Sequence, residues 1–393
     1  MNGILRLTLR YLAYNKLKTI TLVLCVTLAV LLPVLLQFAV SWFEQDLHSR
    51  ANTTPLVAGV KGSRFDLALQ SMYFSRADLE PTSLQAVETI QESGYALPIP
   101  LAVRFTAQGA PVVGTSLDYF DFRKLKVRSG NQLKRLGDCV LGASVAERLQ
   151  LQPGDRLMSD PLNVFDLSGN YPLKMRVVGV LERAHSPDDE AVFVDLKTEW
   201  IISGIGHGHR QINAKTSKDL VLKQKDQQTV ANAAVPQFNE VTEENLASFH
   251  FHGDTNTFPV SLIIVVPYDQ KSEVLLLGMY DSADADLQLI RPTEIVDELL
   301  QMVFRVKQLF DLNTFLVSLS VGLLLVLVFT LSLRLRRRER KTMFQLGCSR
   351  SVIWKLQMTE VLLILVSSLV LVLCITAVVR VYAEQLLRIW IID

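Results

Sequence analysis

Histidine is the residue type whose spacing in this sequence indicates chemistry. Four of the six histidines form two H-x-H pairs, His207 with His209 and His250 with His252. On a β-strand, side chains at positions i and i+2 lie on the same face, so both imidazoles of a pair can bind one ion. Four neutral imidazoles, or three with Asp254, suit a tetrahedral Zn²⁺ site. The alternative is that these histidines are unrelated surface or hinge residues, because the sequence does not show that the two pairs meet.

A second polar segment is the acidic loop of residues 185–190, which contains Asp188, Asp189 and Glu190. Consecutive carboxylates bind a cation or cap a helix in some proteins. Acidic side chains are mostly solvent-exposed, however, so we expect a solvated turn here.

The sequence lacks the common catalytic and nucleotide-binding motifs. It has no G-x-x-x-x-G-K-[ST] phosphate loop, no G-x-S-x-G and no H-E-x-x-H. We therefore expect a protein that is not an enzyme and that needs a separate subunit for any use of ATP. Its 40 Lys and Arg residues balance 39 Asp and Glu residues, so the overall charge does not favour nucleic-acid binding.

Three long apolar stretches are candidate membrane-spanning segments. Residues 19–43, 312–333 and 361–379 contain no charged side chain, and roughly 20 apolar residues cross a hydrocarbon core of about 30 Å. The lipid bilayer is thus an expected partner. The first stretch exceeds the hydrophobic region of a signal peptide and lacks a small-x-small cleavage site, which favours an uncleaved anchor.

Basic residues predict the orientation of these three spans. The N-terminal segment and residues 334–341 are rich in Lys and Arg, which favours a cytoplasmic location for both. The large middle region and the C-terminus are then outside. The expected organisation is a cytoplasmic segment 1–18, a span 19–43, an external domain 44–306, a span 307–333, a cytoplasmic loop 334–356, a span 357–380 and an external tail 381–393.

The predicted fold class is an α+β membrane protein, with three transmembrane helices and a mixed α/β domain between the first and second. Periodicity and turn residues predict strands at 101–105, 112–113, 138–142, 173–181 and 261–266, and helices at 82–93, 143–149 and 271–280. A stalk helix is expected from about residue 292. We expect it to continue into the membrane, the alternative being a hinge near residues 311–313.

The cytoplasmic loop has the most specific pattern in the chain. Arg336-Arg337-Arg338-Glu339, then Leu346-Gly347-Cys348-Ser349-Arg350 and Glu360, resembles the "RRRE…LGASR…E" signature of the MacB/FtsX/LolE-like permeases, the type VII ABC transporters. Residues 139–142 with 153–155 resemble the family's "VVLG…PGD" stretch, and residues 177–181 resemble its "VVGVL" strand. Typical members have a fourth membrane helix, whereas three are predicted here.

The resemblance implies a permease subunit in the bacterial inner membrane that transmits ATP-driven motion to an external domain. It implies an ABC ATPase as partner, a second permease copy, and contact with the ATPase through loop residues Arg338, Glu339, Phe344, Leu346, Gly347 and Arg350. The histidine segments are similar to a subgroup associated with zinc-regulated periplasmic binding proteins, which implies a link to zinc and a periplasmic metal-binding partner. The alternative function is a membrane-anchored metal-binding module or a sensor or scaffold.

Overall fold

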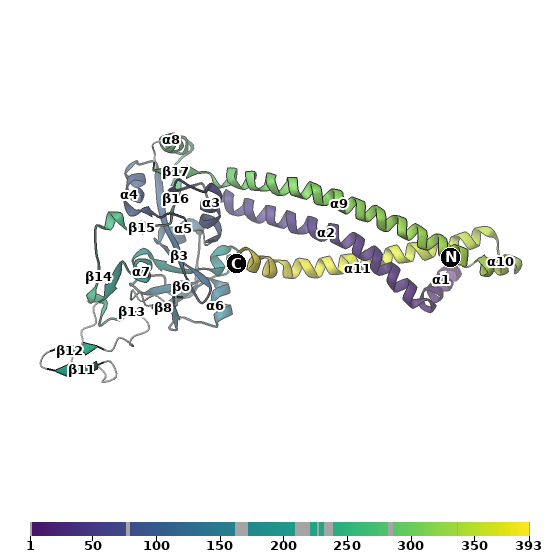
Figure 1. The fold of residues 1–393 in the computed structure, drawn as a ribbon, viewed down its shortest axis with the longest axis horizontal. Coiled ribbons are helices and arrows are strands. Elements are labelled where there is room, and N and C mark those ends of the chain that lie inside the picture. Colours follow the sequence, from purple (N-terminus) through teal and green to yellow (C-terminus); the bar gives the residue numbers. More distant parts are fainter. Residues whose placement is uncertain are drawn as a thin grey trace. The chain divides into compact units, whose positions relative to one another are not determined.

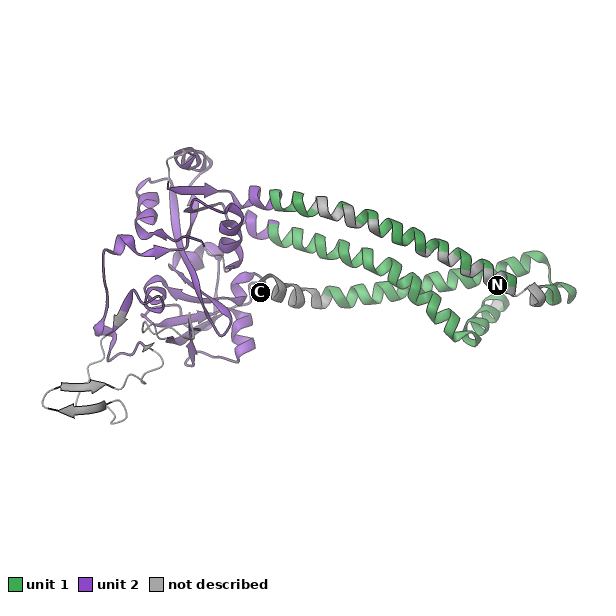
Figure 2. Cartoon of the chain, viewed as in Figure 1, with its two compact units in different colours: residues 1–47, 298–393 green, residues 48–297 purple. Residues whose placement is uncertain are grey.

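The computed structural model of the chain describes residues 2–75, 79–161, 172–208, 221–225, 228–231, 239–281, 286–335 and 337–392. The chain forms two compact units (Figure 2). The first unit comprises residues 1–47 and 298–393, and the second comprises residues 48–297.

The first unit is helical, and its elements are labelled in Figure 1. Its helices are α1 (Asn2–Tyr14), α2 (Lys16–Asn52), α9 (Pro292–Leu335), α10 (Arg337–Gln345) and α11 (Arg350–Ile392). Both α2 and α9 continue into the second unit as single helices. Helix α9 has no break at residues 311–313.

Two helices in the described part of the chain are long and apolar enough to cross a membrane. They are α2 and the Arg350–Arg380 portion of α11. The middle span, expected at residues 307–333, lies within α9. The three-span topology stays a prediction.

The second unit is built on a mixed β-sheet. Among the described residues, eleven strands pair in the order β13-β8-β6-β9-β4-β3-β16-β1-β17, with β5 and β7 both paired to β8. The pairs β4–β9, β6–β8 and β13–β8 are parallel. The bounds are β1 (Leu56–Val60), β3 (Ala96–Ala107), β4 (Ala110–Thr115), β5 (Val127–Gly130), β6 (Asp138–Leu141), β7 (Arg156–Met158), β8 (Leu173–Leu181), β9 (Val192–Asp195), β13 (Asn239–Glu240), β16 (Leu262–Pro267) and β17 (Leu287–Ile290).

Helices and smaller strand pairs complete this unit. The helices are α3 (Arg64–Tyr73), α4 (Leu84–Glu92), α5 (Asp118–Arg123), α6 (Ala143–Leu149), the 3₁₀ helix η1 (Pro187–Glu190), α7 (Leu196–Ile202), the 3₁₀ helices η3 (Leu246–Ser248) and η4 (Thr255–Thr257), and α8 (Gln270–Tyr280). The remaining strands are β2 (Thr82–Ser83), β10 (Gly206–Gly208), β11 (Val221–Lys225), β12 (Gln228–Ala231), β14 (Phe249–Phe251) and β15 (Pro259–Val260). This architecture agrees with the predicted mixed α/β domain.

Two hydrophobic clusters of described residues contribute to the core of the second unit. One contains Leu141, Val145 and Val177, contributed by β6, α6 and β8. The other contains Ile90 and Ile263, from α4 and β16. Alternate residues of β8 are buried, as expected for a strand with one face on a core. The predicted strand 173–181 and helix 143–149 are confirmed with those bounds.

Strand β3 is longer than predicted because it includes Pro98 and Pro100. Proline cannot donate a backbone hydrogen bond, so it is confined to strand ends and edges. Both prolines precede Leu101, where the described pairing with β4 begins, and there β3 pairs with β16 alone. The other edge of residues 96–100 therefore pairs with no described strand, so no strand on that side requires a backbone N–H donor from either proline.

Candidate functional site

Helix α10 and the turn after it form the predicted cytoplasmic coupling segment. The helix ends at Gln345, and Gly347 just beyond it has a φ of 92°, which is readily adopted only by glycine. The Cys348 N–H donates to the Met343 carbonyl at 3.0 Å, and the Gly347 N–H donates to the Phe344 carbonyl at 3.1 Å. This pair of hydrogen bonds is a Schellman cap, which satisfies the last carbonyls of the helix. Gly347 thus sets the sharp turn between α10 and α11.

Two apolar side chains near this turn are exposed. Leu346 is 80% exposed and Phe344 is 51% exposed. The Arg350 guanidinium lies 5.6 Å from the centroid of the Phe344 ring, within range of a cation–π interaction. Arg338 and Glu339 lie on α10, but their side chains, like Arg336, fall outside the described part of the structure. The predicted coupling residues whose side chains are described thus present an apolar and cationic surface.

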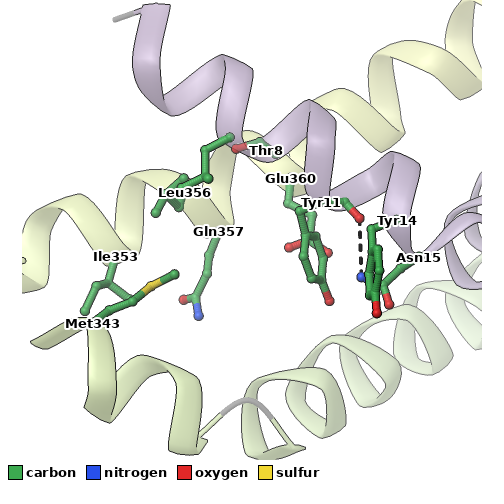
Figure 3. Close-up of a pocket in the computed structure, with 10 residues that line it drawn as sticks. Thr8, Tyr11, Tyr14, Asn15, Met343, Ile353, Leu356, Gln357 and Glu360 are labelled. Carbon is green, nitrogen blue, oxygen red and sulfur yellow. Dashed lines mark hydrogen bonds between the residues drawn. The ribbon is translucent and has the colours of Figure 1, made fainter.

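A cavity of about 310 Å³ lies between α1, α10 and α11 (Figure 3). Its lining combines apolar and polar side chains: Leu7, Thr8, Tyr11, Tyr14, Asn15, Met343, Ile353, Leu356, Gln357 and Glu360. Glu360, from the family-like motif, is nearly buried, and its carboxylate lies 3.7 Å from the Lys18 ammonium of α2. The Thr19 hydroxyl, which bonds to the Leu12 carbonyl at 3.1 Å, also ties α2 to α1. Helix α11, which follows the coupling segment, is therefore packed on the N-terminal helices.

The backbone brings one residue of each predicted histidine pair, His207 and His250, into one small sheet. Strands β10 and β14 are antiparallel, and His207 is paired in register with His250. The rings of His250 and His252 have centroids 4.6 Å apart. The His250 Nδ1 atom contacts the Ser248 carbonyl at 3.0 Å, which places the ring proton on Nδ1 because a carbonyl only accepts.

The four histidines are only partly described. His209 and the side chain of His207 lie outside the described residues. Within the described ranges, no group of three or more His, Cys, Asp or Glu side chains is arranged to hold a metal. A zinc site therefore stays a prediction that depends on His207 and His209.

The acidic loop is not a solvated turn, so that prediction is wrong. Residues 187–190 form η1, and the Asp188 side chain is 1% exposed. Its carboxylate oxygens accept hydrogen bonds from Arg50 at 2.7 and 3.1 Å. The loop does bind a cation, but that cation is the Arg50 guanidinium of the same chain. Sequence reasoning missed the pair because its members are 138 positions apart and neither belongs to a motif.

The sequence of residues 18–235 matches the model of the MacB-like periplasmic core domain, which covers more than half of the chain. This chain belongs to the FtsX/MacB-like family of type VII ABC transporter permeases. The described sheet of the permease lies partly within this matched region, as do α2 and the acidic loop. No curated protein sequence matches the permease.

Two solved structures show a distant similarity to the chain. The periplasmic region of MacB from Actinobacillus actinomycetemcomitans is 12% identical, with coverage of 63% of the permease and 92% of that chain and a TM-score of 0.37. The extracellular domain of the noncanonic ABC-type transporter YknZ from Gram-positive bacteria is also 12% identical, with coverage of 60% and 98% and a TM-score of 0.32. The family assignment rests on the match to the family's sequence model and not on these two structural similarities.

Family membership has direct consequences for the permease. It is a transporter subunit that is not itself a catalyst. The family implies an ABC ATPase as partner and a membrane context.

Proposed function

We propose that this chain transmits the ATP-driven motion of a separate ATPase to its external domain, acting as one of two permease copies in the bacterial inner membrane. Family membership supports the transporter role. The observation that carries the mechanical role is the continuity of α2 and α9, each of which is one helix that belongs to both compact units. A continuous helix transmits displacement along its axis, whereas a flexible linker absorbs it.

The coupling segment is the proposed contact with the ATPase. Leu346 and Phe344 are large apolar side chains in solvent, and their burial against a partner would be favourable. Arg350 and the remaining basic residues of the loop would supply charge complementarity at the rim of that contact.

The replacement Leu346→Asp tests this contact. Burying a leucine contributes roughly 1.5–3 kcal/mol, so we expect at least about tenfold less ATPase to co-purify with the tagged full-length chain. Val274→Asp is the matched control, since Val274 is 60% exposed on α8 in the other unit. Undiminished co-purification with Leu346→Asp, and with a deletion of residues 336–350, would show that the loop is not the docking site.

Zinc binding at the β10–β14 sheet is a second proposed property. The register of His207 with His250 and the close rings of His250 and His252 support it. A ligand histidine commonly donates its other ring N–H to a carbonyl, as His250 does to Ser248. His207, His209, His250 and His252 would be the ligands, and Zn²⁺ captured here would link the permease to a periplasmic metal-binding protein.

Zinc titration of the full-length protein, followed by calorimetry, tests this property. We expect the double variant His250→Ala/His252→Ala to bind Zn²⁺ at least about tenfold more weakly, because two ligands are lost. His185→Ala is the control, since His185 lies outside the two pairs. Zinc affinity that survives alanine at all four positions would exclude these ligands.

A further inference from the structure

The last turn of α2 inserts an arginine into the core of the second unit. Arg50 lies two residues before the end of the helix and is 7% exposed. Its guanidinium donates to Asp188 Oδ2 at 2.7 Å and Oδ1 at 3.1 Å, to the Tyr119 hydroxyl at 3.1 Å, and from Nε to the Met72 carbonyl at 3.0 Å. One side chain of α2 is thus bonded to η1, α5 and α3.

Asp188, the partner of Arg50, is also held by several hydrogen bonds. Asp188 also accepts hydrogen bonds from the Tyr119 hydroxyl at 2.6 Å and the Ser186 hydroxyl at 2.7 Å. Burial alone would raise the pKa of the Asp188 carboxyl. The charge and hydrogen bonds of Arg50, together with the Arg123 charge and the Tyr119 hydrogen bond, outweigh burial and lower this pKa to about 2. The carboxyl is therefore ionised at neutral pH, and the contact is a buried ion pair.

The surroundings of this pair leave it little room to move. The Tyr119 and Phe193 rings lie 5.6 Å apart, and Phe74 and Phe120 pack on the same two rings. Gly142 lies so close beneath η1 that a Cβ atom there would be 2.4 Å from the carbonyl oxygens of Asp188 and Asp189. A shift of η1 would therefore require its neighbours to shift as well.

A second arginine holds the residues that follow α2. Arg123, at the end of α5, donates to the Thr53 carbonyl and hydroxyl at 3.0 Å each and to the Thr54 hydroxyl at 2.8 Å. The junction between α2 and β1 is thus bonded on two sides, by the Arg50 side chain and by Arg123.

Stability alone does not account for a buried ion pair at this place. Desolvation offsets much of the attraction between the charges, and apolar side chains of similar volume often pack as stably. A planar guanidinium that donates two hydrogen bonds to a carboxylate fixes the direction and distance between the two side chains. Apolar packing specifies both less strictly. The geometry points to a positional role.

We propose that Arg50 is a positioning residue that locks the end of membrane helix α2 to η1 and α5, so that a displacement of α2 moves the sheet of the domain. This inference rests on the proposed function. It adds the specific joint through which one of the two continuous helices acts on the domain.

Spin labels test the lock in the purified full-length protein. They are attached to cysteines introduced at the exposed positions Ser49 and Arg148, after the protein's own reactive cysteines are replaced. Lysine keeps the charge of Arg50 but loses the planar guanidinium, so we expect Arg50→Lys to broaden the distance distribution about twofold. Tyr119→Phe, which removes a single hydroxyl, should broaden it less. The matched control is Arg176→Lys, because Arg176 forms a similar ion pair with Asp138 at 2.7 Å between strands of the sheet. A distribution as narrow in Arg50→Lys as in the wild type overturns the inference.

Hydrogen exchange in the complex with the co-purified ATPase separates this inference from the proposed function. We expect ATP to change amide exchange in residues 187–195 of the wild type. In Arg50→Lys that change should fall by about half or more, while ATP hydrolysis stays near the wild-type rate. A full change in Arg50→Lys overturns the joint and leaves the proposed function standing. No change in the wild type overturns the proposed function, and the joint with it.

Discussion

At the scale of single residues, Glu199 on α7 is an ionisable group in unfavourable surroundings. It is fully buried, and neither carboxylate oxygen has a hydrogen-bond partner among the described residues. Burial raises the pKa of this carboxyl to about 8, against a smaller opposing effect of Arg104. The folded protein therefore holds a proton on Glu199 that the unfolded chain releases above about pH 4.5.

The stability of the protein should consequently fall as the pH rises. The stabilising contribution of protonated Glu199 is complete below pH 4.5 and is lost up to about pH 8. Between pH 5 and 8 we expect the wild type to lose roughly 2–5 kcal/mol of unfolding free energy, which Glu199→Gln should largely retain. Denaturant unfolding at both pH values measures this. Glu88→Gln, at an exposed site of α4, is the control, and an equal loss in Glu199→Gln and the wild type would contradict the assignment.

At the scale of elements, the α10–α11 segment shows how a short motif determines local geometry. Gly347 allows the left-handed residue of the cap, and the Ser349 hydroxyl accepts from the Val352 N–H at 3.4 Å where α11 begins. Leu346 is exposed because it lies in the turn and not on the face of either helix that packs inward. The effect of Leu346→Asp on ATPase binding is therefore expected without loss of either helix.

At the scale of the whole molecule, the predicted topology is the property that most needs a direct test. Cys348 is exposed and adjoins the basic loop, so the positive-inside rule predicts a cytoplasmic position. With Cys25 and Cys374 replaced by serine, an impermeant maleimide should label Cys348 only in permeabilised spheroplasts. A cysteine at Tyr268, which is 67% exposed, should be labelled in intact ones. Labelling of Cys348 in intact spheroplasts would contradict the predicted orientation.

The sequence by itself determined the features that depend on neighbouring residues. The apolar runs, the alternation in residues 173–181, the helix at 143–149 and the motif around Gly347 are all local patterns. The structure confirms the strand and the helix, and the family model matches residues 18–235. The two histidine pairs were equally visible as a pattern. Only the backbone register of β10 and β14 brought His207 opposite His250.

The tertiary structure decided the features that depend on burial. An isolated acidic loop is better solvated by water than by protein, which is why Asp188 was expected at the surface. Arg50, 138 positions earlier in the chain, supplies the compensating charge that makes its burial tolerable. Glu199 is buried because α7 packs closely on β4, where a Cβ atom at Gly114 would lie 2.8 Å from the Glu199 Cβ. Such contacts exist only after distant segments have folded together, so no local pattern in the sequence encodes them.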